Sequence, residues 1–303
     1  ASLMVKMHIP VLQKEVIEYL KPEPNENFID CTVGEGGHSL AILEKNEPRG
    51  KVLGIDVNLE VLKNTKYKIQ DTKYKIRLIL VCDNFANLKE IIKKIKFGKA
   101  DGALMDLGIS SWHLEESKRG FSFQKNEPLE MRYNSENPKL TAEKILNEYP
   151  EQEIERILRE NGEEKFAERI VKGIAVNRKV KPIQTTFQLV EIIRRSVPSW
   201  YQEQRIHFAT KTFQALRIAV NDELNSLKKA LPQALEALEP QGRVVVISFH
   251  SLEDRIVKDF FREKAKEGGV KILTKKPIRP SRIEAEENPR SRSAKLRAAI
   301  KIN

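Results

Sequence analysis

The sequence is poor in cysteine and has no long apolar runs. Only Cys31 and Cys82 occur among its 303 residues, and neither belongs to a C-x-x-C pair. This pattern argues against a disulfide framework and a cysteine zinc site, and we expect both thiols to be buried and reduced, as in a cytoplasmic protein. Because no apolar stretch approaches the length of a membrane span, we expect neither a transmembrane helix nor a signal peptide. The five histidines lack ligand-like spacing, so no metal site is predicted.

Over the whole chain, basic residues outnumber acidic ones. There are 54 Lys and Arg against 43 Asp and Glu, a formal net charge of +11 with a pI of about 9.4. Such an excess favours a polyanionic partner such as nucleic acid, although a lysine-rich thermophile surface gives the same balance. The segment 274–301 carries nine basic and three acidic residues, a net +6. We expect it to contact phosphates, with Arg290 and Arg292 as the best candidates.

Short apolar runs alternate with helical segments at both ends of the chain, a pattern typical of a parallel sheet. The runs are Phe28–Cys31, Lys51–Ile55, Ile76–Val81, Ala103–Met105, Arg243–Phe249, Val270–Leu273 and Leu296–Ile302. A turn is predicted at 239–242, before the fifth run. A helix with Pro232 as a kink is predicted to precede that turn.

The middle of the chain has helical spacing instead. From 140 to 229 apolar residues recur three and four apart, with Thr141 and either Thr185 or Thr186 as helix N-caps. The simplest arrangement is one α/β domain made of residues 1–108 and 213–303, interrupted by a helical domain at 109–212.

A glycine-rich loop, Gly34-Glu35-Gly36-Gly37-His38, follows the first predicted strand. Glycines there let the backbone turn tightly and bring a ligand to the N-terminus of the next helix. Asp56 ends the second strand, where a carboxylate can accept hydrogen bonds from ribose hydroxyls. The pattern predicts a pocket for an adenosine-type cofactor but does not choose between a nicotinamide cofactor and S-adenosylmethionine. Ser39 stands where the dinucleotide fingerprint requires glycine or alanine.

Three later strand ends carry further candidates. Phe85 follows the third strand and can stack on adenine, or be a core residue. Asp106 ends the fourth, where the reacting group of a cofactor should lie; the alternative is a turn or capping aspartate. His250 follows the fifth and can orient a substrate within a polar cluster that includes Asp254, or serve structure alone.

A helical face near the end of the middle region is also polar. Four side chains are spaced three, four and three residues apart, namely His207, Lys211, Gln214 and Arg217. This spacing places them on one face. The face is predicted either to contact RNA or to be an ordinary solvated surface.

Taken as motifs, these residues identify a family. The chain resembles the bacterial 16S ribosomal RNA cytidine N4-methyltransferases, the RsmH (formerly MraW) family, over nearly its whole length. The matching motifs are His8–Leu12, Gly34–Ser39, Met105–Ser111, Arg119–Phe123, Ala209–Asn221, Ile247–Arg255 and Asn288–Arg297. The runs Ser248–Arg255 and Asn288–Ser293 are highly specific to the family, whereas the glycine loop is not.

The resemblance implies a class I S-adenosylmethionine-dependent methyltransferase fold, Rossmann-like with a mostly parallel sheet and an inserted all-helical domain. It implies methyl transfer to a cytidine N4 in the decoding region of 16S ribosomal RNA, with that RNA or the small ribosomal subunit as partner. The implied cofactor-binding residues are Gly34, Gly36, Gly37, His38, Asp56, Phe85, Asp106 and His113. His113 replaces the family's usual glutamine, Glu130 an aspartate and Asn161 a tyrosine.

The strand-end positions and the chemistry make Asp106 and His250 the candidate catalytic residues, and spacing and charge make Lys211, Arg217, Arg290 and Arg292 the RNA-binding candidates. Cytosine N4 is poorly nucleophilic, because its lone pair is delocalised into the ring. An acceptor for an N4 proton would localise that lone pair. Asp106 is therefore a candidate for assisting the amine, or else for binding only the amino-acid end of the cofactor.

Three alternatives stay open on sequence. They are a nicotinamide-dependent oxidoreductase, a non-catalytic RNA-binding protein on this scaffold, and a DNA amine methyltransferase. The last usually has an Asp or Asn-Pro-Pro-Tyr motif after the fourth strand, where this chain has Asp106-Leu107-Gly108. Monomer and homodimer are both compatible with the sequence, as are free RNA and the assembled subunit as substrates.

Overall fold

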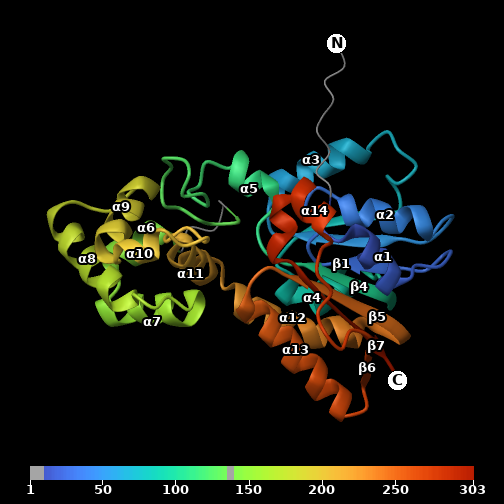
Figure 1. Ribbon diagram of the computed structural model, residues 1–303. Helices are drawn as coiled ribbons and strands as arrows, with labels where there is room; N and C mark the ends of the chain where they lie inside the picture. The colour runs from blue at the N-terminus through green and yellow to red at the C-terminus, as the bar shows by residue number, and fades with distance from the viewer. Residues whose placement is uncertain (1–9, 135–139) are drawn as a thin grey trace. The chain divides into compact units, whose positions relative to one another are not determined.

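The computed structural model describes residues 10–134 and 140–303, and these form two compact units (Figure 1). The first unit contains the chain up to Gly108 together with Leu224–Asn303, and the second is Ile109–Glu223. His8 and Ile9, which begin the first family motif, lie outside the described residues. Within the described ranges, no helix combines the length and apolar character needed to cross a bilayer.

The first unit is built on a seven-stranded sheet in the order β3-β2-β1-β4-β5-β7-β6. Strands β1 to β5 run parallel, and β7 lies antiparallel between β5 and β6. The strands are β1 Phe28–Asp30, β2 Val52–Asp56, β3 Leu78–Cys82, β4 Ala100–Asp106, β5 Leu238–Ser248, β6 Val270–Ile272 and β7 Lys295–Lys301. Each matches a predicted apolar run. This mostly parallel sheet confirms the expected class I methyltransferase fold.

Helices cover both faces of the sheet. The core on one face includes residues from α4 (Leu88–Ile95), α12 (Glu223–Ala237) and α13 (Ser251–Lys266). The core on the other includes residues from α1 (Gln13–Leu20), α2 (Gly37–Lys45) and α3 (Leu59–Ile69). The remaining elements are η1 Phe85–Asn87, α14 Arg282–Glu287 and η2 Pro289–Ser293. Burial on both faces explains why the central strands are apolar at nearly every position.

The turn predicted at 239–242 is wrong, because these residues lie within β5. Ala100 pairs with Leu238 and Gly102 with Arg243, so the extra residues of β5 form an irregularity opposite β4. Polar and glycine residues that resemble a turn here allow a bulge within one strand.

Cys82 also departs from expectation. Cys31 is buried in β1 as predicted, but Cys82 is exposed. The reason is its position, since it ends β3, the strand at the edge of the sheet.

The second unit consists of helices and loops in its described part, with an isolated bridge between Pro128 and Thr185. Its helices are α5 Ser111–Glu115, α6 Ala142–Glu148, α7 Glu151–Gly162, α8 Ala167–Val180, α9 Thr186–Ser196, α10 Ser199–Gln202 and α11 Thr210–Asn221. The predicted caps are confirmed at Thr141, whose Oγ1 accepts from Lys144 N at 3.1 Å, and at Thr185, which forms a capping box with Gln188.

The return to the first unit comes at Leu224 rather than at the predicted residue 213. Helix α11 belongs to the helical unit because it packs closely on α7. A Cβ added to Gly162 of α7 would lie 2.6 Å from the carbonyl oxygen of Lys211. That contact brings the two backbones together, and the apolar face of α11 is buried with α7 in one core.

Candidate cofactor site at the carboxyl edge of the sheet

The glycine loop joins β1 to α2 and requires glycine for two different reasons. Gly36, the N-cap of α2, has φ +85°, a left-handed conformation that side chains with a Cβ adopt at a cost. Gly37 begins the helix, and a Cβ there would lie 2.4 Å from Cγ of Pro10. Backbone conformation at Gly36 and lack of space at Gly37 favour glycine at both positions, and glycine here lets a ligand approach the N-terminus of α2 closely.

Asp56 lies beside this loop, as its spacing from the glycines predicts. Its Oδ2 accepts a hydrogen bond from Gly34 N at 3.1 Å and its Oδ1 from Asn58 N at 2.8 Å. Burial raises the pKa of the Asp56 carboxyl to about 6. A carboxylate anchored by backbone N–H groups keeps lone pairs free for ribose hydroxyls.

Asp30 is a member of the site that the sequence interpretation missed. It ends β1, is 1% exposed, and accepts hydrogen bonds from Ser39 Oγ at 2.7 Å and Thr32 N at 3.1 Å. Burial raises the pKa of this carboxyl. The signal was available, since Asp30 ends a strand directly before the loop, as Asp56 and Asp106 end theirs. Ser39 thus has a structural role that glycine or alanine would not supply.

Asp106 and His38 form the polar centre of this edge. Asp106 N donates to Thr32 Oγ1 at 2.7 Å, which ties the end of β4 to the residues after β1. His38 Nε2 lies 3.5 Å from Asp106 Oδ2. Among the described residues, neither ring nitrogen of His38 nor Oδ1 of Asp106 has a hydrogen-bond partner, although all three atoms are buried. Buried polar atoms are nearly always paired, so these three, gathered where β4 and the glycine loop meet, are candidates for contact with a ligand.

Phe85 lies at the carboxyl end of β3, at the start of η1. Asn84 fixes this turn, because its side chain accepts from Ala86 N at 2.8 Å and donates to Ser226 Oγ at 3.2 Å. Phe85 is half-buried and packs against the core below. It therefore has both a core contact and an accessible surface, and both predicted roles are compatible with its position.

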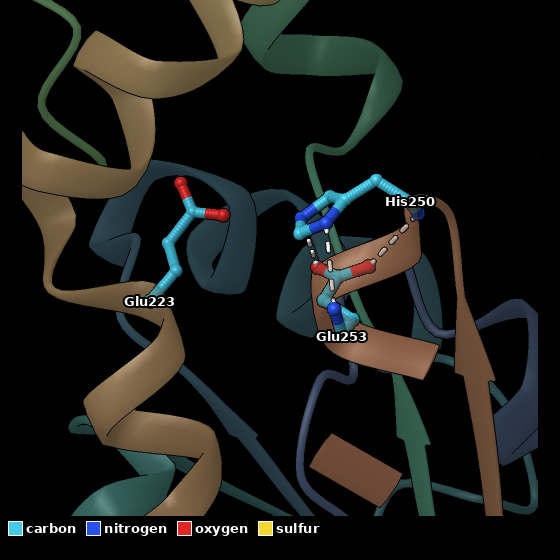
Figure 2. Close-up of side chains that lie close together, drawn as sticks. All are labelled: Glu223, His250 and Glu253. Carbon is cyan, nitrogen blue, oxygen red and sulfur yellow. Dashed lines mark hydrogen bonds and ion pairs between the residues drawn. The ribbon is translucent and has the colours of Figure 1, made fainter. Parts of the chain in front are cut away.

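His250 has a structural explanation. It is the N-cap of α13. Its Nδ1 accepts from Glu253 N at 3.4 Å, and Glu253 Oε2 accepts from His250 N at 3.4 Å (Figure 2). Its Nε2 lies 3.1 Å from Glu253 Oε1. The reciprocal bonds make a capping box, in which histidine takes the place of the usual serine or threonine.

The sequence predicts a polar cluster that includes His250 and Asp254. In the structure, Asp254 pairs with other residues instead. Its Oδ1 accepts from Arg297 Nε at 2.6 Å, and Lys295 Nζ lies 3.5 Å from its Oδ2. This pairing lowers the pKa of the Asp254 carboxyl despite partial burial. Asp254 therefore joins α13 to β7.

His113 lies in the helical unit and is 5% exposed. Its Nδ1 is 2.8 Å from Ser110 Oγ. Its ring makes edge contacts with the rings of Trp112, Phe121 and Tyr133. Burial and then the charge of Arg119 lower the pKa of this imidazole to about 3, so it is neutral near pH 7. Nearby, Glu130 pairs with Arg132 at 3.0 Å.

The three polar side chains of α11 on this face each have a hydrogen-bond partner within the helical unit. Lys211 Nζ donates to Glu163 O and Gln214 Nε2 donates to Asn161 O, both at 3.0 Å. Arg217 makes two bonds to the carboxylate of Glu223, at 2.8 and 2.9 Å. The face therefore covers the C-terminal end of α7 and pairs with Glu223. The ring of His207 stacks on Phe123, with centroids 4.4 Å apart.

The basic C-terminal segment offers a different surface. Arg292 is exposed, and its Nε donates to Ala285 O at 3.0 Å. Arg290 is half-buried in η2. Arg297, in β7, is buried in its ion pair with Asp254. Of these three arginines, Arg292 has the most accessible charge.

A family model described as the MraW methylase family matches residues 5–302. The chain belongs to this family. Ribosomal RNA small subunit methyltransferase H of Heliobacterium modesticaldum is 49% identical over 315 residues, covering 99% of this chain and 100% of that protein. The protein of the same name from Thermotoga neapolitana is 49% identical over 295 residues, covering 96% and 95%. A solved putative rRNA methylase from Clostridium thermocellum aligns at 12% identity and a TM-score of 0.49, covering 98% and 100%.

Membership of the MraW methylase family decides the question that the glycine loop left open. The chain is a methyltransferase, and the nicotinamide-dependent alternative is wrong. The match includes the glycine loop, Asp56, Phe85 and Asp106, and extends through the basic C-terminal segment.

Proposed function

We propose that this enzyme transfers a methyl group from S-adenosylmethionine to the N4 amine of a cytidine in the decoding region of 16S ribosomal RNA. The observation that carries the proposal is the set of three unpartnered buried atoms on His38 and Asp106, where β1 and β4 end. The RNA class is supported by the names of the relatives, and the acceptor atom by the family resemblance. An enzyme acting on bacterial small subunits works in the cytoplasm.

The residues of this edge fit S-adenosylmethionine. Gly36 and Gly37 would let it approach the first turn of α2, Asp56 would bind the ribose hydroxyls, and the face of Phe85 suits adenine. His38 and Asp106 would bind its amino-acid end, where an ammonium group suits the unpartnered Oδ1. When bound, the cofactor supplies an electrophilic methyl group, and what remains for the protein is alignment.

Asp106 is placed to assist the amine as well. Its backbone is fixed by the Thr32 hydroxyl and its Oδ2 faces His38, so Oδ1 has a defined position. A carboxylate oxygen there can accept a hydrogen bond from the N4 amine and stabilise the positive charge that develops during transfer. The target base must leave its stack to reach this edge.

We assign cofactor binding to the first unit and part of the RNA surface to the basic C-terminal segment. Arg290 and Arg292 are the proposed phosphate contacts. Lys211 and Arg217 have intramolecular partners, so an RNA contact would have to replace existing hydrogen bonds. His250 has a structural role as a cap, and a role in substrate binding is secondary.

The decisive experiment is transfer of labelled methyl from S-adenosylmethionine to undermethylated small subunits, with wild type and Asp106→Ala side by side. Mass spectrometry of the labelled nucleoside then identifies the acceptor. Label on cytidine N4 that is lost in the variant supports the proposal. Label on another nucleoside contradicts the acceptor, and cofactor binding without transfer to subunits or free RNA favours a binding protein.

The same variant separates the two roles of Asp106. If Oδ1 binds the amino-acid end of the cofactor, Asp106→Ala weakens binding of S-adenosylhomocysteine in calorimetry. If Oδ1 assists only the amine, the dissociation constant stays at the wild-type value while kcat falls.

A further inference from the structure

Residues 10–13 support the glycine loop from outside. The pyrrolidine ring of Pro10 occupies the space beside Gly37 that a Cβ would need. Gln13 Nε2 donates to the carbonyl oxygen of Gly37 at 3.4 Å. The position of the first turn of α2, against which the cofactor would bind, therefore depends on where this short segment lies.

Glu284 holds that segment from the other end of the chain. Its Oε1 accepts a hydrogen bond from Leu12 N at 2.7 Å. Leu12 is fully buried and has φ 53°, a left-handed conformation that is unfavourable for leucine, and it begins α1 without a side-chain cap. A charge-assisted bond to its N–H stabilises this conformation, so Glu284 fixes the segment at its most constrained residue.

Glu284 lies on α14, which is also joined to the basic segment. Arg292 of η2 donates to Ala285 O at 3.0 Å, and Asn288 N donates to Glu284 O at 2.7 Å. A continuous series of contacts therefore leads from Arg292 through α14 and Leu12 to the glycine loop. Each contact lies within the first unit.

We propose that Glu284 is a positioning residue that holds residues 10–13 against the glycine loop and couples cofactor binding to RNA binding by the basic segment. The second part of this proposal, the coupling between cofactor and RNA, rests on the proposed function. RNA phosphates bound at Arg290 and Arg292 restrain α14, which restrains Leu12 and the loop. By thermodynamic reciprocity, RNA and cofactor then strengthen each other's binding by the same factor.

The test compares Glu284→Ala and Glu284→Gln in the full-length enzyme, with Glu286→Gln as a matched control. Glu286 lies on the same helix but pairs with exposed Arg282 at 2.9 Å. In calorimetry with S-adenosylhomocysteine and no RNA, Glu284→Ala is expected to raise the dissociation constant roughly fivefold to tenfold. Glu284→Gln keeps an acceptor oxygen and should restore most of the affinity, and Glu286→Gln should match wild type.

Steady-state kinetics show whether the effect is positioning. Glu284→Ala should raise KM for the cofactor with little change in kcat, whereas general damage to the fold lowers kcat as well. The proposal is overturned if Glu284→Ala binds S-adenosylhomocysteine with the wild-type dissociation constant. It is also overturned if Glu284→Gln and Glu286→Gln lose as much affinity as each other. If the alanine variant does not fold, Gln13→Ala removes the other tether, and wild-type affinity in that variant overturns the proposal.

Coupling is measured by repeating the titration with a saturating RNA fragment of the decoding region. RNA should tighten S-adenosylhomocysteine binding in wild type and do so less in Glu284→Ala; equal tightening in both overturns the coupling. Methyl transfer by wild type is scored separately. If wild type transfers no methyl group but the variants still differ in RNA-free binding of S-adenosylhomocysteine as expected, the proposed function is contradicted. The positioning role of Glu284 is then still supported.

Discussion

Two polar regions of this molecule differ in whether their side chains have hydrogen-bond partners within the protein. At the carboxyl edge of the sheet, His38 and Asp106 keep buried atoms without partners among the described residues. On α11, Lys211, Gln214 and Arg217 all bond to groups of their own unit. Sequence spacing marked both regions as candidate sites. The structure distinguishes them, because atoms that fold without a partner are available for a ligand, whereas satisfied groups stabilise the fold.

The largest expected effect tests the unpartnered region. Asp106→Asn should lower kcat by about 10²- to 10³-fold, because it removes the negative charge proposed to stabilise the transition state. The midpoint temperature of thermal unfolding should be the same as in wild type or slightly higher, because the charge of Asp106 has no strong intramolecular partner to lose. A large fall in stability in parallel with kcat would make Asp106 a structural residue and remove the contrast with α11.

The next effect tests the satisfied region. Arg217→Ala should lower the free energy of unfolding by about 2 kcal/mol, because it leaves the half-buried Glu223 without its two charged hydrogen bonds. Arg195→Ala is the control, as Arg195 pairs with exposed Glu191 and should contribute under about 0.5 kcal/mol. Both are measured by urea unfolding. If Arg217→Ala leaves stability intact but weakens RNA binding, the RNA-contact alternative for α11 is correct.

Asp56 gives a pH test of the cofactor edge. Its pKa is raised to about 6 by burial, so the carboxylate that would accept ribose hydroxyls is present above that pH and is lost below it. The dissociation constant of S-adenosylhomocysteine should rise up to about tenfold for each pH unit below 6. Asp56→Asn should bind weakly with a flatter pH profile. A wild-type profile that is level between pH 5 and 8 would exclude Asp56 from the site.

Arg292→Ala should have the smallest effect. A single exposed phosphate contact contributes modestly, so RNA affinity should fall about twofold to fivefold irrespective of sequence, and the salt-dependence slope should fall by about one. Filter binding across a salt series measures both. Lys276→Ala, in the same basic segment, tests whether the effect belongs to Arg292 or to net charge, and an equal loss there would assign it to charge alone.

Much of this fold was predictable because its strands are short apolar runs, and three of the seven, β1, β2 and β4, end in aspartate. Asp56 and Asp106 were found by that rule, and Thr141 and Thr185 by the local chemistry of helix caps. The ion-pair partners of the charged side chains were not predictable from the sequence. Arg217 binds Glu223 and Asp254 binds Arg297, and both choices depend on tertiary contacts that spacing along one helix does not reveal.

Local composition also misled in one place. Residues 239–242 have the composition of a turn, but Leu238 before them and Arg243 after them both pair with β4, so they form an irregularity within β5. Tertiary contacts also decide where the helical unit ends, at Glu223. Helix α11 has an apolar face whichever unit it joins, and only its contact with Gly162 shows where that face is buried.

The order of the strands also has a consequence for how the enzyme is made. The half-sheet β3-β2-β1-β4 is complete once Asp106 has been synthesised, but β4 receives its neighbour β5 only from Leu238 onward. At usual translation rates the ribosome needs roughly 10 s to produce the intervening helical unit. During that interval the nascent chain has an unpaired, apolar edge at β4, the kind of edge that invites aggregation. Early folding of the helical unit, or a chaperone bound at β4, would protect the enzyme until β5 arrives.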